Sequence, residues 1–250
     1  MSIVMPFALA LAFGITALLY ASVGFGGGST YNALLVLAGT DYRILPAIAL
    51  ICNIIVVAGG SWRYAREGCV PWARLWPILL LSAPLAWLGG RIAIERDHFV
   101  LILGLSLLVA AILMLTQRES EGQGDHDPRW RWAAPLTGAG VGLLSGLVGI
   151  GGGIFLAPVL HLARWAPPRV IAGSASVFIL INSLAGLAGQ ASKIGSDRIG
   201  DVAAYWPLVL GVLVGGQIGS LLGARILPPR LIRIATALLI AYVAIRLLLI

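Results

Sequence analysis

Stretches without a single charged side chain recur along the whole chain and limit what it can fold into. They cover 1–40, 44–62, 75–90, 99–117, 132–163, 170–192 and 202–224, and an apolar run from Ile234 is interrupted by Arg246 alone. Most approach the roughly 20 residues that cross a bilayer as a helix. The runs are continuous, without the alternation that a barrel wall requires. We therefore expect an all-α polytopic membrane protein, and the long uncharged amino-terminal run does not fit a cleavable signal.

The two longest runs each contain a cluster of glycines. The sequence GFGGG occupies 24–28 and GIGGG occupies 149–153. Consecutive glycines cover every face of a helix and weaken it by roughly 1 kcal/mol each. We therefore predict that the helix breaks at both clusters, with a new helix beginning at 29–31 and another at 154 or 155.

Other features recur in the same order in the two halves of the chain. Asn53 matches Asn182, the dipeptide WP occurs at 76 and at 206, and LGGRI at 88 resembles LGARI at 222. Gene duplication is common in transporters, and paired glycine-interrupted segments mark their binding sites. The pattern predicts a first membrane repeat over 1–116, a cytoplasmic linker over 117–132 and a second membrane repeat over 133–250.

The orientation of the repeats follows from the positive charges. If the first segment of each repeat crosses the membrane, the 17 Lys and Arg residues divide almost evenly between the two sides. If it re-enters instead, each repeat has three further transmembrane helices, the repeats are inverted, and eleven of the positive residues share one side. Positive loops stay in the cytoplasm. The re-entrant arrangement therefore predicts that the linker is inside and both chain ends are outside. The eleven residues are Arg63, Arg66, Arg74, Arg118, Arg129, Arg131, Arg164, Arg169, Arg225, Arg230 and Arg233.

A helix that starts inside the membrane exposes unpaired N–H groups and the positive end of its dipole. Two such ends meeting near the midplane bind an anion without a buried cation. All ten acidic residues lie in loops or at helix ends, which disfavours a cation site. The buried polar candidates are neutral. The predicted substrate-binding residues are Gly24, Phe25, Gly26, Gly27, Gly28, Ser29, Thr30, Asn53, Gly149, Ile150, Gly151, Gly152, Gly153, Phe155, Ser174, Ser176 and Asn182.

Composition excludes several other classes of function. The chain is 59% hydrophobic and 11% charged, whereas globular chains carry about 25% charged residues. Its net charge of +7 comes from single arginines at helix ends, which orient spans and do not indicate nucleic-acid binding. Cys52 and Cys69 lack the spacing of a zinc site or a disulfide framework. We expect no metal and no cofactor. The glycine rows 138, 142, 146 and 211, 215, 219, 223 have the four-residue spacing of close helix packing.

With the paired glycine segments, the stretch GLLSGLVGIGGGIFLAPVL at 142–160 and AGSASVFILINS at 172–183, the chain resembles the TauE/SafE family of membrane transporters. The second half matches better than the first. The resemblance covers nearly the whole chain and implies an inner-membrane transporter with inverted repeats, which exports sulfite or organosulfonates. It also implies that 24–30, 149–155, Asn53 and Asn182 form the pore or the site.

These observations favour a secondary transporter that works by alternating access in the lipid bilayer. A passive anion channel would use the same site. An intramembrane hydrolase would need a nucleophile and a base, for which Ser145 and His161 are the candidates, although they form no recognisable motif. A proton is a candidate coupling ion, but a lone histidine such as His161 at a helix end is more often an interface residue than a proton carrier. The sequence leaves open the anion, the direction, the coupling ion and the oligomeric state.

Overall fold

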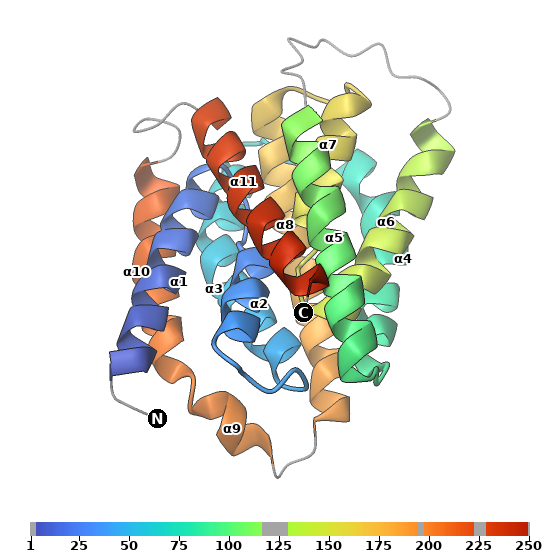
Figure 1. Cartoon of the computed structure of the whole chain (residues 1–250). Helices are drawn as coiled ribbons and strands as arrows, with labels where there is room; N and C mark the ends of the chain where they lie inside the picture. The colour runs from blue at the N-terminus through green and yellow to red at the C-terminus, as the bar shows by residue number, and fades with distance from the viewer. Residues whose placement is uncertain (1–3, 117–129, 195–197, 223–228, 250) are drawn as a thin grey trace.

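The computed structural model describes residues 4–116, 130–194, 198–222 and 229–249, and these form a helical bundle (Figure 1). The first half contains α1 (Val4–Ser22), α2 (Gly28–Leu37), α3 (Leu45–Arg66), α4 (Trp72–Arg91) and α5 (Arg96–Thr116). The second half contains α6 (Trp130–Val148), α7 (Gly153–Leu162), α8 (Pro168–Lys193), α9 (Ile199–Ala203), α10 (Trp206–Leu222) and α11 (Pro229–Leu248). Most of the predicted linker, together with Gly223, lies outside the described residues.

Both predicted helix breaks are confirmed. The first charge-free run forms α1 and α2, separated by residues 23–27, and the run over 132–163 falls within α6 and α7, separated by 149–152. The new helices begin at Gly28 and Gly153, one residue earlier than the earliest starts predicted. They begin there because Gly27 and Gly152 take the left-handed conformation, with φ of 97° and 80°, which glycine adopts without steric cost.

The long helices of the two halves pack in a reciprocal pattern. Helix α1 lies along α10 of the second half, and α6 lies along α4 of the first half. Helix α3 packs against α8, and α5 packs against α11. In this pattern α1–α5 correspond in order to α6, α7, α8, α10 and α11, and α9 is an addition in the second half.

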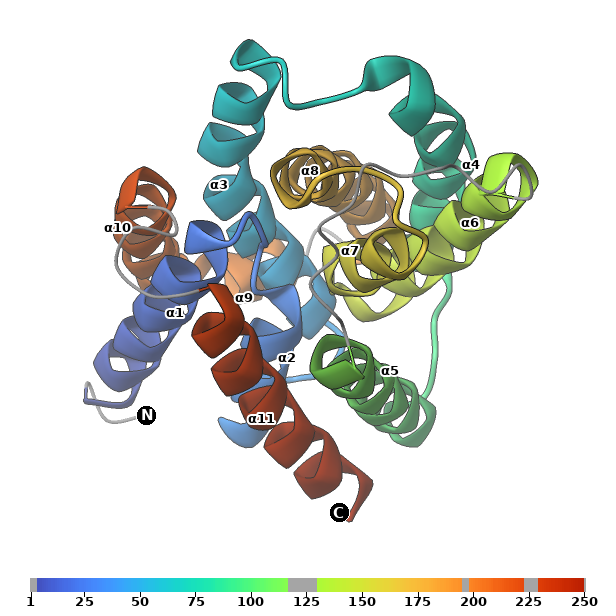
Figure 2. The same ribbon diagram turned by 90° about the horizontal axis from the view of Figure 1, so that it is seen from above.

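The first two helices of the first half run in directions opposite to those of the first two helices of the second half in Figure 1. The start of α1 and the end of α11 lie in the lower half of the view, whereas the end of α5 and the start of α6 lie at the top. Helix α1 therefore runs upward and α2 returns downward after the break, while α6 runs downward and α7 returns upward. Seen from above, α7 and α8 lie toward the middle, and α10, α4, α6, α5 and α11 lie at the periphery (Figure 2).

Four of the described helices, α3, α4, α5 and α8, are long and apolar enough to cross a membrane, and shorter apolar helices accompany them. Helices α3 and α8 are more buried than α4 and α5. The outer faces carry large exposed apolar side chains, including Leu101, Leu105 and Ile112 of α5. Exposed apolar surface on this scale fits contact with lipid. The chain is thus built as a multi-pass membrane protein.

The glycine rows of α6 and α10 mark close helix packing, as predicted. A methyl group on Gly142 would overlap the backbone of Ser82, and one on Gly146 would overlap the carbonyl of Ala86. On α10, Gly215 and Gly219 meet the backbone of α1 in the same way. The absence of side chains at these positions lets two backbones approach each other closely.

Replacing Gly146 with leucine is expected to destabilise the protein. The added side chain has only the α4 backbone to displace, so the cost falls at or above the upper end of the roughly 1–3 kcal/mol of overpacking. The unfolding temperature in detergent should fall by roughly 5–10 °C. Gly140→Leu is the matched control, since Gly140 lies on the same helix with nothing within 4 Å of its added Cβ. Equal melting temperatures for the two variants would contradict the packing role.

Candidate functional site

Asn53 of α3 lies between the two glycine breaks. Its Nδ2 donates a hydrogen bond of 3.0 Å to the carbonyl oxygen of Ile150, in the second break. A methyl group on Gly26 or Gly28 would overlap the same amide from the other side. The two glycine segments, far apart in the sequence, therefore meet at one fully buried asparagine.

The helix starts at this point are uncapped. Gly27 and Gly152 occupy the N-cap positions of α2 and α7, and neither helix has a side-chain cap. The first N–H groups of such helices have no intrahelical acceptor and concentrate the positive end of the helix dipole. Both helix starts therefore offer N–H donors to an anion.

One face of α8 lies against both glycine breaks. Ser176 donates a hydrogen bond of 2.6 Å to the carbonyl oxygen of Gly24. Ile179 lies against the glycines of both breaks, and Ser183 lies 3.1 Å from where a methyl group on Gly151 would stand. The spacing of these three residues places them on one side of the helix.

Several buried polar atoms at the site have no hydrogen-bond partner among the described residues. They include Asn53 Oδ1, Ser183 Oγ and Ser145 Oγ. The predicted residue Ser174 is also buried and its Oγ has no partner among the described residues, but it lies two residues before Ser176, about 200° around α8 from the face that meets the breaks. A buried polar atom without a partner is unusual and costly. A polar ligand or water that enters between the breaks would satisfy such groups.

The pairing of Asn53 with Asn182 is corrected by the structure. A methyl group on Gly28, at the start of α2, would meet Asn53, and a methyl group on Gly153, at the start of α7, would meet Ile179. Ile179 therefore takes the place around the second break that Asn53 takes around the first. Asn182 instead donates to Ser82 Oγ of α4 at 3.1 Å and to the carbonyl oxygen of Phe178 at 2.9 Å. Its contacts join α8 to α4.

The remaining predicted residues lie within the breaks or in the first turns of α2 and α7. Thr30 Oγ1 shares a hydrogen bond of 2.7 Å with the hydroxyl of Tyr20. Ser29 and Phe155 are buried in the first turns of α2 and α7, and Phe25 is partly buried before Gly26. Asn32, which was not among the predicted binding residues, donates to the carbonyl oxygen of Val148 at 2.6 Å. It thereby ties α2 to the end of α6.

The hydrolase pair is not assembled. Ser145 lies beside Gly152, at the start of α7. His161 lies in the last turn of the same helix, nine residues further on, which is about 13 Å along the axis. A nucleophile and its base must approach within hydrogen-bonding distance.

Charged side chains form ion pairs at the two ends of the molecule. Arg198, before α9, contacts Asp41 in the α2–α3 loop at 2.9 Å, and Arg169, at the start of α8, contacts Glu67 after α3 at 2.6 Å. In each pair one residue follows the broken segment of one half: Asp41 follows α2, and Arg169 follows α7. Its partner lies between two long helices of the other half: Arg198 lies between α8 and α10, and Glu67 lies between α3 and α4. Partial burial acts to raise the pKa of Asp41, but the backbone N–H of Arg43 and the guanidinium of Arg198 hold this pKa below its ordinary 3.8. The Asp41 pair therefore persists at neutral pH.

Comparison with known proteins gives a family match over nearly the whole chain. The family described as "Sulfite exporter TauE/SafE" matches residues 8–247. The chain belongs to the TauE/SafE family. It is 33% identical over 244 residues to "Probable membrane transporter protein y4hK" of Sinorhizobium fredii, covering 96% of this chain and 97% of that protein. The resemblance predicted from the glycine segments is thus confirmed.

Two more distant relatives carry the same kind of name. A "Probable membrane transporter protein" of Methanocaldococcus jannaschii is 28% identical over 195 residues, covering 74% of this chain and 72% of the relative. "Probable membrane transporter protein MamO" of Magnetospirillum gryphiswaldense is 25% identical over 280 residues, covering 96% of this chain and 44% of the relative. No solved structure matches the chain significantly. Family and relatives together indicate a membrane transporter and not an enzyme.

Proposed function

We propose that this TauE/SafE protein is a secondary transporter that exports a small anion, sulfite or an organosulfonate, across the inner membrane. The observation that carries the proposal is the meeting of two glycine breaks at Asn53. Two uncapped helix starts and neutral amide and hydroxyl groups supply donors there, and the described residues around Asn53 include no charged side chain. Dipoles bind an anion weakly enough to release it, which a transporter requires. The substrate class comes from the family name.

The test is uptake of labelled sulfite and sulfoacetate into proteoliposomes, with and without an imposed pH gradient. Concentrative uptake driven by the gradient supports a coupled transporter with the proton as coupling ion. Flux that only equilibrates would favour a passive anion channel. If neither anion moves beyond protein-free liposomes, the proposed substrate class is wrong.

The proposal includes an inverted pair of repeats around the site. Its support is the reciprocal packing of α1 with α10 and of α6 with α4, and the opposite course of α1 and α6 in Figure 1. The described positive residues at the end of the molecule where α5 ends and α6 begins include Arg63 and Arg66 in the last turn of α3 and Arg74 in the first turn of α4. Positive loops stay in the cytoplasm.

A reporter fused after the last residue should therefore lie outside the cytoplasm. We expect alkaline phosphatase fused at this position to be active. Green fluorescent protein fused at the same position should be non-fluorescent. The matched fusion carries the reporter between α5 and α6, where the opposite result is expected. A carboxyl-terminal reporter that reads cytoplasmic would contradict the orientation.

Alternating access requires a gate at each end of the site, and the two ion pairs have suitable positions for it. Exposed pairs contribute only about 0–1 kcal/mol each. Interactions this weak can break and re-form during transport. Each pair also joins the two halves of the chain, so that its opening accompanies a movement of one half relative to the other.

Cross-linking each pair should stop transport reversibly. The variants carry Asp41→Cys with Arg198→Cys, or Glu67→Cys with Arg169→Cys, in a background with Cys52 and Cys69 replaced by serine. A short reducible bis-thiol reagent should inhibit uptake at least tenfold in either double variant, and a reducing agent should restore it. Each single cysteine variant is the control. Full transport after complete cross-linking at one end would exclude a gate there.

A further inference from the structure

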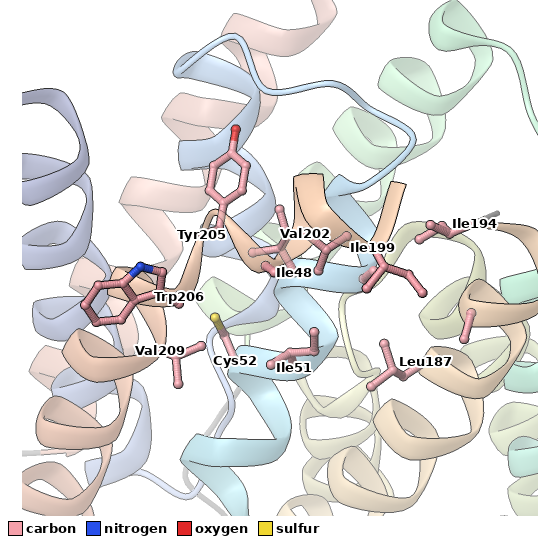
Figure 3. A pocket seen from close by; sticks show the side chains of 13 residues that line it. Ile48, Ile51, Cys52, Leu187, Ile194, Ile199, Val202, Tyr205, Trp206 and Val209 are labelled. Carbon is pink, nitrogen blue, oxygen red and sulfur yellow. The ribbon is translucent and has the colours of Figure 1, made fainter. Parts of the chain in front are cut away.

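An apolar cavity of about 430 Å³ lies between α3, α8, α9 and α10 (Figure 3). Its described lining residues include none from the glycine breaks and none that carries a charge. The hydroxyl of Tyr205 in its lining already donates to Thr40 Oγ1 at 3.2 Å, and most of the other side chains are aliphatic. A cavity of this chemistry gives an anion little to bind. Further donors for the transported anion are therefore expected at the breaks themselves.

Tyr31 of α2 brings a hydroxyl group back to the first glycine break. Long side chains on a helix point toward its amino-terminal end. Tyr31 is the fourth residue of α2, and its backbone N–H donates to the carbonyl oxygen of Gly27 at 2.9 Å. A methyl group on Gly27 would stand 3.0 Å from the Tyr31 hydroxyl oxygen. The hydroxyl therefore lies beside the N-cap of α2, where the first N–H groups of the helix are free.

This hydroxyl is buried and has no hydrogen-bond partner among the described residues. Tyr31 is 0% exposed, and no described atom accepts from or donates to its oxygen. The nearby Tyr20 is also buried, but its hydroxyl shares a hydrogen bond of 2.7 Å with Thr30. A buried polar group without a partner is costly. The unpaired hydroxyl of Tyr31 thus points to a ligand at the start of α2.

Packing alone does not require a hydroxyl at this position. The ring of Tyr31 stacks on Phe13 of α1, with centroids 4.5 Å apart and planes 15° from parallel, and a phenylalanine ring would make the same contact. The fourth residue of α7 is Leu156, which is fully buried and whose N–H donates to the carbonyl oxygen of Gly152 at 3.1 Å. The second half of the chain therefore fills the equivalent place with an apolar side chain.

Tyr31 and Asn53 contact consecutive glycines of the first break. Methyl groups on Gly26 and Gly28 would meet the amide of Asn53, whereas one on Gly27 would meet Tyr31. Because consecutive Cα atoms are about 3.8 Å apart, both side chains reach the same short segment of backbone. An anion at the uncapped start of α2 can accept hydrogen bonds from the backbone N–H groups and from the Tyr31 hydroxyl.

We infer that the Tyr31 hydroxyl donates a hydrogen bond to the transported anion at the start of α2. The inference rests on the proposed anion transport and adds a specificity-determining residue to its site. A phenol donates its O–H to an oxygen of sulfite or of a sulfonate, and a bond to a charged acceptor is stronger than one to a neutral acceptor. Removing the oxygen atom alone should therefore weaken binding of the anion and leave the shape of the site unchanged.

The experiment compares Tyr31→Phe with the wild type in proteoliposomes, with labelled sulfite and labelled sulfoacetate as the anions. The half-saturating concentration of the transported anion should rise by about tenfold or more, whereas the maximal rate should stay within about twofold. Tyr242→Phe is the matched control, because Tyr242 is 57% exposed on α11. It loses the same oxygen atom and should leave both values unchanged.

Unfolding temperatures of the same preparations test for a purely structural role. Tyr31→Phe removes no hydrogen bond between described residues, so the unfolding temperature without anion should not fall. The anion should raise the unfolding temperature of the wild type, and at the same anion concentration this rise should be smaller in Tyr31→Phe. Tyr20→Phe is the contrasting variant, since the loss of its bond to Thr30 should lower the unfolding temperature.

The outcomes separate the inference from the proposed function. Uptake by the wild type with the same half-saturating concentration in Tyr31→Phe would overturn the inference and leave anion transport standing. A lower unfolding temperature of Tyr31→Phe with an unchanged rise on adding the anion would also overturn it, because the hydroxyl would then serve the structure alone. If the wild type transports neither anion, the proposed function fails, and the inference with it.

Discussion

Asn53→Asp is expected to abolish anion transport. The substitution keeps the shape of the side chain but replaces an N–H donor with a carboxylate between two breaks that meet there. An asparagine amide has two N–H donors, and the bond to Ile150 uses one of them. At an effective dielectric constant near 20, two like charges about 4 Å apart repel each other by roughly 4 kcal/mol. Uptake at a fixed low concentration should fall at least 100-fold.

Asn53→Ala separates the charge from the lost hydrogen bond. It removes the amide without adding a carboxylate, and we expect transport to fall about fivefold, since one buried hydrogen bond is worth roughly 1 kcal/mol. Both variants should be compared at equal amounts of monodisperse protein. If the aspartate variant transports as well as the alanine variant, the anion does not pass close to Asn53.

The breaks could be predicted from the sequence because their cause is local. A glycine cluster inside a charge-free run weakens the helix whatever surrounds it, and Gly27 and Gly152 both adopt the left-handed conformation. Packing glycines such as Gly142 were also predictable, because a four-residue spacing places small residues on one face of a helix.

The predicted correspondence of Asn53 with Asn182 was wrong because identical residues at similar places in the two halves of the sequence need not occupy equivalent positions in the structure. The residue that corresponds in space is Ile179, three residues earlier on α8. Three residues on a helix turn the side chain by about 300° and move it by about 4.5 Å. That is sufficient to remove Asn182 from the breaks and direct it toward Ser82.

Helix α9 and Ser183 could not be assigned from the sequence for a different reason. The charge-free run over 202–224 reads as one span, but the chain turns at Ala204 and Tyr205 before α10 begins. Ser183 has no sequence feature that separates it from other membrane serines, which usually bond to their own helix. Its place at the second break depends on how α8 packs against α3.

Gly151→Ala is expected to block transport by occupying the space between the breaks. The added methyl group would lie 2.7 Å from Asn53 Nδ2 and 3.1 Å from Ser183 Oγ, where an anion would meet both donors. Gly39→Ala is the matched control. Both glycines have positive φ, 84° and 73°, so both variants carry similar backbone strain, but a methyl group on Gly39 has nothing within 4 Å.

Both variants should lose some stability through backbone strain, and Gly151→Ala should lose more because its methyl group also displaces Asn53, but only Gly151→Ala should lose uptake, by about tenfold or more. Unfolding temperature and labelled-sulfite uptake measured on the same preparations distinguish the two effects. If both variants lose uptake equally, backbone strain explains the loss. If neither does, the space at Asn53 is wider than a bound anion needs, and the anion crosses elsewhere. A loss of uptake confined to Gly151→Ala, in protein that remains folded and monodisperse, supports a path of the anion between the two breaks, where the added methyl group lies.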